Sequence, residues 1–204
     1  MLFDNLVEHL AYRGGTGWQR DHYGYQYVLA GNGLFKAARS PLIRALLPIF
    51  YHRIAGLPPL TPECVVLPER VPGLVLHRIL DDALRANNQG LEKMYQVDRV
   101  ETSFSDSWRV TAPAQRMSAT RIVYEVGESS GVVCELHSHH RLAAYFSETD
   151  DADETAFRFY AVIGRLHDEP EIRLRLGIYG DFIPLPATVL FTDDGPFTDC
   201  LTQE

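Results

Sequence analysis

The sequence has few cysteines and no long apolar run, and each shortage excludes a class of protein. Its three cysteines, Cys64, Cys134 and Cys200, lie far apart without Cys-x-x-Cys spacing, so we expect neither a disulfide framework nor a cysteine-based zinc site. No segment approaches the roughly 20 apolar residues that a membrane helix needs. The first residues lack the basic and apolar regions of a signal peptide. These shortages predict a cytoplasmic protein without a membrane partner.

Basic residues are also scarce. The 204 residues include 19 Lys and Arg against 27 Asp and Glu, which gives a formal net charge of -8. Because nucleic-acid binding requires clustered positive charge, we expect no nucleic-acid partner. Hydrophobic residues make up 46% of the chain and charged residues 23%, a balance typical of globular proteins.

Five prolines between residues 56 and 73 predict an extended connector that divides the chain. The predicted parts are a small N-terminal region over 1–70 that ends in this connector, a main domain over 71–192 and an acidic tail over 193–204, expected to be mobile. Within the first part, alternation predicts a strand over 23–30, and Gly-Asn-Gly at 31–33 predicts a turn into a return strand. Ser40 before Pro41 predicts a capped short helix over 41–47.

The main domain mixes the two kinds of element. Apolar residues at helical spacing between Leu76 and Leu84 predict a helix that ends near Gly90. A capping signature predicts a short helix over 147–154. Strands are predicted over 91–97, 108–111, 121–126, 131–139, 157–166 and 171–179. Together these elements indicate an α+β (α/β-like) fold.

One segment, residues 135–154, carries candidate chemistry. Alternate residues of a strand share a face, so His137 and His139 would present two imidazoles side by side, which suits zinc. Asp150 in the following helix would add an oxygen ligand. Three protein ligands leave one coordination position open, as in catalytic zinc sites. Taken singly, the histidines could be surface residues, Ser147 only a helix cap, and Asp150 only a charge at a helix N-terminus.

The joint pattern is His-x-His, seven residues, Ser, two residues, Asp. It resembles the motif of the JAMM/MPN-plus family, also called JAB or Mov34, over roughly residues 74–190. The resemblance implies a JAMM/MPN-type mixed sheet with flanking helices. Family members are zinc-dependent hydrolases, many of which cleave peptide or isopeptide bonds at the C-terminus of ubiquitin-like proteins. It implies that His137, His139 and Asp150 are zinc ligands and that Ser147 stabilises the oxyanion. His140 stands where the family commonly has proline.

The family also uses a glutamate from an earlier strand as general base. Glu92 is our choice, because it follows the first predicted helix and begins a predicted strand. Tyr95 stands where the family usually has glycine, three residues after that glutamate. Glu135, two residues before His137, is the rival.

A narrower resemblance links residues 137–182, together with Tyr-Val-Leu-Ala-Gly-Asn-Gly-Leu-Phe at 27–35, to the PRTRC-system protein A branch of this family. It implies a bacterial mobile-element cassette with a ThiF-like, E1-related partner and a ubiquitin-like substrate. The alternative is a non-catalytic MPN-type protein-interaction module. A zinc deaminase is disfavoured because its Pro-Cys-x-x-Cys pattern is missing, and a serine hydrolase because Gly-x-Ser-x-Gly is missing.

Overall fold

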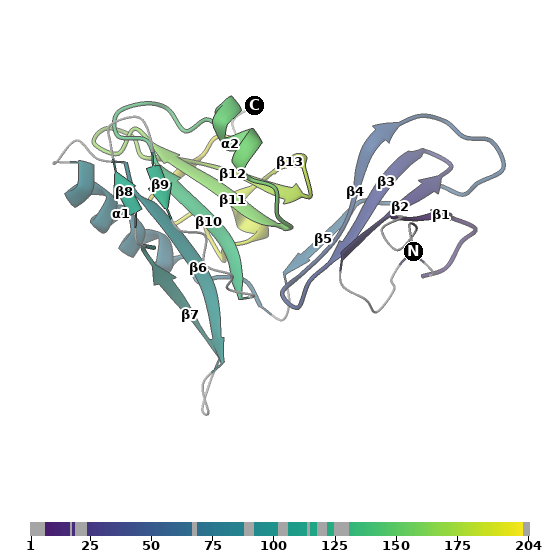
Figure 1. Cartoon of the computed structure of the whole chain (residues 1–204), viewed down its shortest axis with the longest axis horizontal. Helices are drawn as coiled ribbons and strands as arrows, with labels where there is room; N and C mark the ends of the chain where they lie inside the picture. The colour runs from purple at the N-terminus through teal and green to yellow at the C-terminus, as the bar shows by residue number, and fades with distance from the viewer. Residues whose placement is uncertain are drawn as a thin grey trace, which may run out of the picture. The chain divides into compact units, whose positions relative to one another are not determined.

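The computed structural model describes residues 7–16, 18, 24–66, 69–87, 92–101, 106–113, 115–117, 122–124 and 131–201. The chain divides into two compact units, Met1–Pro68 and Glu69–Glu204, each of which is described by itself (Figure 1). No helix among the described residues is both long and apolar enough to cross a membrane.

The first unit is a five-stranded sheet in the order β1-β2-β3-β4-β5, with only the β1–β2 pair parallel. Its strands are β1 (Glu8–Ala11), β2 (Gly24–Ala30), β3 (Gly33–Arg39), β4 (Ile43–Tyr51) and β5 (Glu63–Val66). The predicted turn at 31–33 joins β2 to β3. The Asn32 amide holds this turn by exchanging two hydrogen bonds with the Leu60 backbone, at 2.8 and 2.9 Å. The apolar core of the first unit comprises Trp18, Val28, Ala30, Phe35, Ala37, Leu46 and Leu60.

The predicted helix over 41–47 is wrong, because this segment begins strand β4. Ser followed by Pro is favoured at the first two positions of a β-turn as well as at a helix start. Here Ser40 Oγ accepts hydrogen bonds from the backbone of Leu42 and Ile43, and Ser40 N donates to Ile43 O at 2.8 Å. The turn folds β4 back on β3. Within the proline-rich segment that was predicted to be an extended connector, Glu63–Val66 forms strand β5 and pairs with β4.

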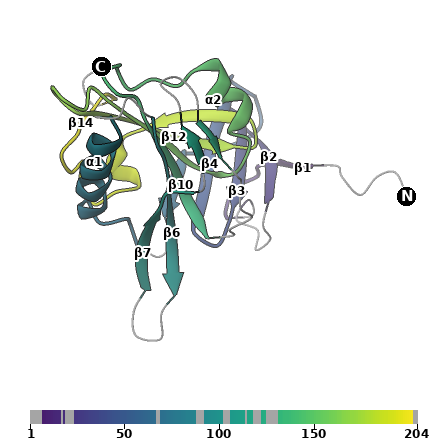
Figure 2. The ribbon, with the colours of Figure 1, turned by 60° about the vertical axis from the view of Figure 1, so that its left-hand side comes forward.

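The second unit has an α+β fold, as predicted. Its large sheet has the order β13-β12-β11-β10-β6-β7, with β14 beside β12 (Figures 1 and 2). The large-sheet strands are β6 (Met94–Glu101), β7 (Asp106–Thr111), β10 (Val132–Ser138), β11 (Arg158–Gly164), β12 (Glu171–Ile178), β13 (Asp181–Leu185) and β14 (Thr198–Asp199). Two short strands, β8 (Gln115–Met117) and β9 (Ile122–Tyr124), form a separate pair. The helices are α1 (Leu74–Asn87), α2 (Glu148–Asp153) and a 3₁₀ turn at Ala187–Val189.

Strand β10 lies inside the sheet and is buried over its whole length. It pairs in parallel with β11 and antiparallel with β6. The predicted strand over 91–97 begins only at Met94. Leu91 and Gly90, where the preceding helix was predicted to end, lie outside the described residues. So do the ends of the predicted strand at 121–126. Met94 pairs with His137, whereas Tyr95 on the other face of β6 bonds Asp82 of α1. Helix α1 therefore covers the face opposite His137.

The tail was expected to be mobile, and this expectation is wrong for residues 193–201. Thr198–Asp199 pair in parallel with β12. Phe197 is buried, and the carboxylate of Asp199 accepts a hydrogen bond of 2.7 Å from Ala187 N. The buried Phe197 and the hydrogen-bonded Asp199 thus hold this segment against the sheet, although its composition is acidic and rich in turn residues.

Candidate metal centre

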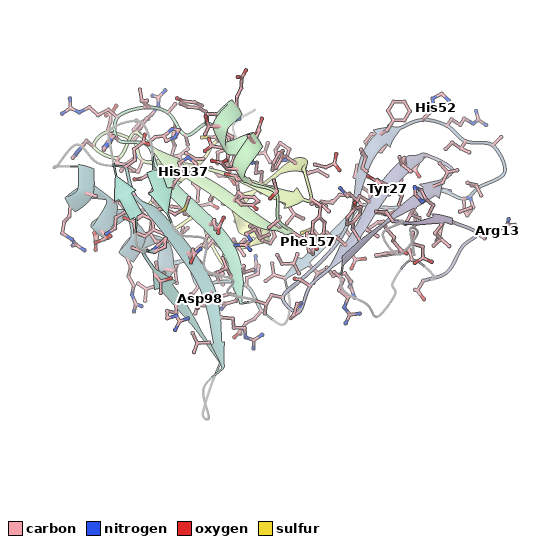
Figure 3. All side chains as sticks on the ribbon, viewed as in Figure 1. Arg13, Tyr27, His52, Asp98, His137 and Phe157 are labelled. Atoms are coloured by element: carbon pink, nitrogen blue, oxygen red, sulfur yellow. The ribbon has the colours of Figure 1, made fainter. Side chains whose placement is uncertain are left out.

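The two predicted imidazoles lie together at the end of β10. His137 is inside the strand, and Figure 3 labels it toward the α2 end of the sheet. His139 lies just beyond the strand, where its backbone N–H donates to Ile163 O at 2.7 Å and so continues the pairing with β11. Both side chains are buried, and their Nε2 atoms are 3.2 Å apart.

The environment of His139 selects its tautomer. Its Nδ1 lies 3.2 Å from the carbonyl oxygen of Ala143, which can only accept a hydrogen bond. Nδ1 therefore carries the proton, and Nε2 presents a lone pair toward His137. The Tyr145 ring packs edge-on against the His139 imidazole, with 4.7 Å between centroids. A backbone carbonyl that orients the second nitrogen is the usual support of a metal-binding histidine.

Asp150 reaches the histidines from α2, and its two carboxylate oxygens have different partners. Oδ2 accepts hydrogen bonds from Ser147 N at 2.6 Å and Ser147 Oγ at 2.7 Å, while Oδ1 lies 3.7 Å from His137 Nε2. Ser147 is the N-cap of α2, and its hydroxyl also accepts from Asp150 N at 3.2 Å, which completes a capping box. The cap therefore turns one oxygen of Asp150 toward the histidines.

The hydroxyl proton of Ser147 is consequently directed at Asp150. In the arrangement that the structure shows, Ser147 caps the helix and orients Asp150. The role in oxyanion stabilisation that the family resemblance implies would require this hydroxyl to rotate away from Asp150 Oδ2.

Two donor-atom distances are close to those in a zinc site, although the group whose ligand atoms all lie within 4.8 Å of one another comprises His137, Asp150 and Glu154 and does not include His139. Ligand atoms of a tetrahedral zinc site, with bonds of about 2.0–2.1 Å, lie roughly 3.3 Å from one another. The corresponding distances are 3.2 Å between the two histidine Nε2 atoms and 3.7 Å between His137 Nε2 and Asp150 Oδ1. Burial lowers the pKa of His137 and that of His139, which keeps both imidazoles neutral, as metal ligands must be.

Glu92 lies beside this donor set. Ser138 N donates to Lys93 O, and Lys93 N donates to Ser138 Oγ, each at 3.0 Å, so the β6–β10 pairing continues past Met94. In this register Glu92 stands opposite His139. Burial raises the pKa of Glu92 to about 7, and the negative charge of Asp150 contributes to the increase. Glu92 is thus a buried carboxyl near Asp150 that can exchange a proton near neutral pH.

The rival glutamate is engaged elsewhere on the same sheet face. Glu135 Oε1 accepts hydrogen bonds from Arg158 Nη1 at 2.7 Å and Gln96 Nε2 at 3.1 Å. Glu135 is thus held by an ion pair with Arg158 and a hydrogen bond from Gln96, whereas Glu92 is the glutamate that stands opposite His139.

Sequence reasoning missed Glu154, the C-cap residue of α2. Single ligand atoms of His137, Asp150 and Glu154 all lie within 4.8 Å of one another, and Glu154 is buried. Its Oε2 accepts from Arg175 Nε at 2.8 Å and Nη2 at 2.6 Å. Burial raises the pKa of Glu154, although the ion pair with Arg175 opposes this increase. The i,i+4 spacing from Asp150, which places two acids on one helix face, was the available signal.

Comparison with known proteins found one family model, and its match spans the candidate metal centre. Residues 78–177 match the family model of prokaryotic homologs of the JAB domain. The matched range runs from α1 into β12 and contains the two histidines, Asp150, Ser147 and Glu92. This match supports the JAB/MPN family for the second unit. No curated protein shows significant similarity to the chain.

Proposed function

We propose that the second unit is a JAMM-type zinc hydrolase that cleaves a peptide or isopeptide bond at the C-terminus of a ubiquitin-like protein. The observation that carries this proposal is the position of His137 Nε2, which lies 3.2 Å from His139 Nε2 and 3.7 Å from Asp150 Oδ1, distances close to the spacing of zinc ligands. The match to the JAB family model and the buried Glu92 beside Asp150 support it.

The chain's own residues divide the chemistry among them. Zinc, when bound, would polarise the scissile carbonyl and lower the pKa of the attacking water. Glu92 would accept a proton from that water and pass it to the leaving amine, which suits a carboxyl whose pKa is raised to about 7. Ser147, after its hydroxyl turns from Asp150, would donate to the developing oxyanion, a contact worth about 3 kcal/mol in such sites.

The identity of the substrate and partner is a separate proposal. Its support is the resemblance of residues 137–182 to the PRTRC-system protein A branch. We propose accordingly that the protein works within a bacterial mobile-element cassette beside a ThiF-like, E1-related partner. Co-purification of the chain with its ThiF-like neighbour tests this pairing independently of hydrolysis.

The first test is metal content. After zinc loading and removal of excess metal, the wild-type protein should retain about one zinc per chain, and His139→Ala and Asp150→Ala should retain none. The matched controls are His77→Ala on the exposed side of α1 and Asp153→Ala, exposed in the same helix as Asp150. Both should keep the metal. A wild-type protein that retains no zinc would refute the proposed function.

The second test separates the metal from the chemistry. A ubiquitin-like protein carrying a fluorescent amine at its C-terminus serves as substrate. Glu92→Gln should keep its zinc and lose hydrolysis by at least about 100-fold, as expected when a general base is removed. Full activity of Glu92→Gln would refute its assignment as the base. Zinc binding without hydrolysis would favour a non-catalytic MPN-type interaction module, for which the engagement of the Ser147 hydroxyl by Asp150 is the supporting observation.

A further inference from the structure

Helix α2 carries Asp150, yet ordinary packing does not explain how the helix is held. It has only six residues, and none of them is buried. Short helices in water depend on tertiary contacts, usually through an apolar face, because their own hydrogen bonds are too few. The capping box joins Ser147 to Asp150 inside the helix, so it shapes the helix without attaching it to the sheet.

Arg175 of β12 supplies the attachment. Its Nη1 bonds Asp151 Oδ1 at 2.5 Å, while Nε and Nη2 bond Glu154 Oε2 at 2.8 and 2.6 Å. All three guanidinium nitrogens are therefore used on α2 and its C-cap. The two acceptors lie one and four residues beyond Asp150, so the helix can neither slide nor turn without breaking a charge-assisted hydrogen bond.

Two aromatic rings fix the guanidinium itself. Phe146 and Phe182 each lie with their ring centroid 3.8 Å from Arg175 Cζ. Phe146 directly precedes the N-cap Ser147, and Phe182 belongs to β13. The Arg175 side chain is only 7% exposed and its partner Glu154 9%, whereas Asp151 is 54% exposed. Lysine cannot reproduce this arrangement, since its ammonium is a point charge without a planar face or a forked set of donors.

We infer that Arg175 is a positioning residue for the candidate metal centre. It anchors α2 through Asp151 and Glu154 and thereby holds Asp150 Oδ1 toward His137. The consequence for zinc binding rests on the proposed function, whereas the anchoring of α2 is a property of the metal-free protein and can be tested without zinc.

Zinc affinity, measured by competition with a chromophoric chelator, tests the first part. Arg175→Met should weaken zinc binding by about 10- to 100-fold, the usual cost of losing a supporting contact behind a metal ligand. Arg175→Lys should recover little of the loss. The matched control is Arg109→Met, which removes another arginine–aspartate pair, with Asp98 of β6. It should leave the affinity unchanged, and equal affinity of Arg175→Met and the wild type would overturn the inference.

Hydrogen exchange of the metal-free protein tests the second part. The α2 amides of Asp151 and Glu154, which bond Ser147 O and Asp150 O, should exchange at least tenfold faster in Arg175→Met, while the β11 amides keep their protection. Unchanged α2 exchange would overturn the anchoring. If Arg175→Met also loses the protection of its β11 amides, the experiment is repeated with Glu154→Gln. This isosteric variant weakens the ion pair and leaves the Arg175 guanidinium in place. If α2 exchanges faster in Arg175→Met and the wild type binds no zinc, the anchoring is preserved and only the proposed function is refuted.

Discussion

The two helices of the second unit are held to the same sheet by different forces. Helix α1 buries an apolar stripe, of which Leu76 and Ile79 are 0% and 1% exposed. Helix α2 buries no residue: the capping box shapes it, and ion pairs with Arg175 hold it to the sheet. The helix that carries no candidate ligand thus depends on the non-directional hydrophobic effect, whereas the helix that carries Asp150 depends on directional contacts.

This difference has a physical reason. Apolar packing fixes a face of a helix but tolerates small shifts and repacking of side chains. A metal centre requires its ligand atoms to stay close to one geometry, and charge-assisted hydrogen bonds impose both distance and direction. On this view, substitutions on α1 should change the stability of the fold and leave the candidate site intact. Substitutions around α2 should instead weaken the candidate site and change the stability of the fold little.

The largest expected effect is on α1. Ile79→Ala removes a buried side chain that is 1% exposed and should lower the free energy of unfolding by about 2–5 kcal/mol, through lost burial and the cavity left behind. Urea unfolding of the metal-free protein measures the loss, and the folded variant should still bind one zinc. Leu74→Ala, at the 61% exposed first position of the same helix, is the control and should change little. Loss of zinc by Ile79→Ala without loss of stability would contradict the comparison.

An intermediate effect is expected at the cap of α2. Ser147→Ala removes the hydroxyl that bonds Asp150 Oδ2 and Asp150 N, at a local cost of about 1 kcal/mol. Because Asp150 Oδ2 then keeps only the hydrogen bond from the backbone N–H of residue 147, its orientation is less restricted and zinc affinity should fall by roughly tenfold. Ser147→Thr keeps a capping hydroxyl and should retain most of the affinity. If Ser147→Ala binds zinc as the wild type does, the cap does not orient the ligand.

The sequence predicted the parts of the site that depend on local rules. The alternation of residues 131–139, the capping signature at Ser147 and the spacing from His137 to Asp150 all concern neighbours along the chain, and the structure has a strand and a capped helix at these places. The Ser-Pro start of the expected helix over 41–47 is the counterexample, since the same two residues also begin a β-turn. The pairing of β4 with β3, which decided the outcome, is not local.

Glu154 and Arg175 could not be joined from the sequence for the same reason. They lie 21 residues apart, on the C-cap of α2 and on β12, and their contact depends on the order of strands in the sheet. The sandwich that fixes Arg175 adds Phe146 and Phe182 from two further elements. Among the residues that the structure describes, the contacts that anchor α2 therefore depend on the order of strands in the sheet, whereas the candidate ligands could be found from a local sequence motif.

The smallest effect on stability is expected at Asp82, because α1 also makes polar contacts and these should contribute less than its apolar packing. Asp82 bonds Tyr95 Oη at 3.1 Å and pairs with Lys93 and Arg85. Burial alone would raise the pKa of Asp82, but hydrogen bonds from Lys93 and Tyr95 outweigh it and lower the pKa below its ordinary value of 3.8. A lowered pKa in the folded state means that these contacts add stability above pH 3.8 and lose it as the pH falls through the folded value.

Asp82→Asn should therefore cost less than about 1 kcal/mol at pH 7, because the Asp82 side chain is 33% exposed and solvent screens the pair. The difference in urea midpoint between this variant and the wild type should narrow as the pH falls below 3.8. Asp81→Asn, an exposed neighbour on the same helix, is the control for a general change in net charge. A cost as large as that of Ile79→Ala would mean that α1 too is held by ion pairs, and the contrast between the two helices would be lost.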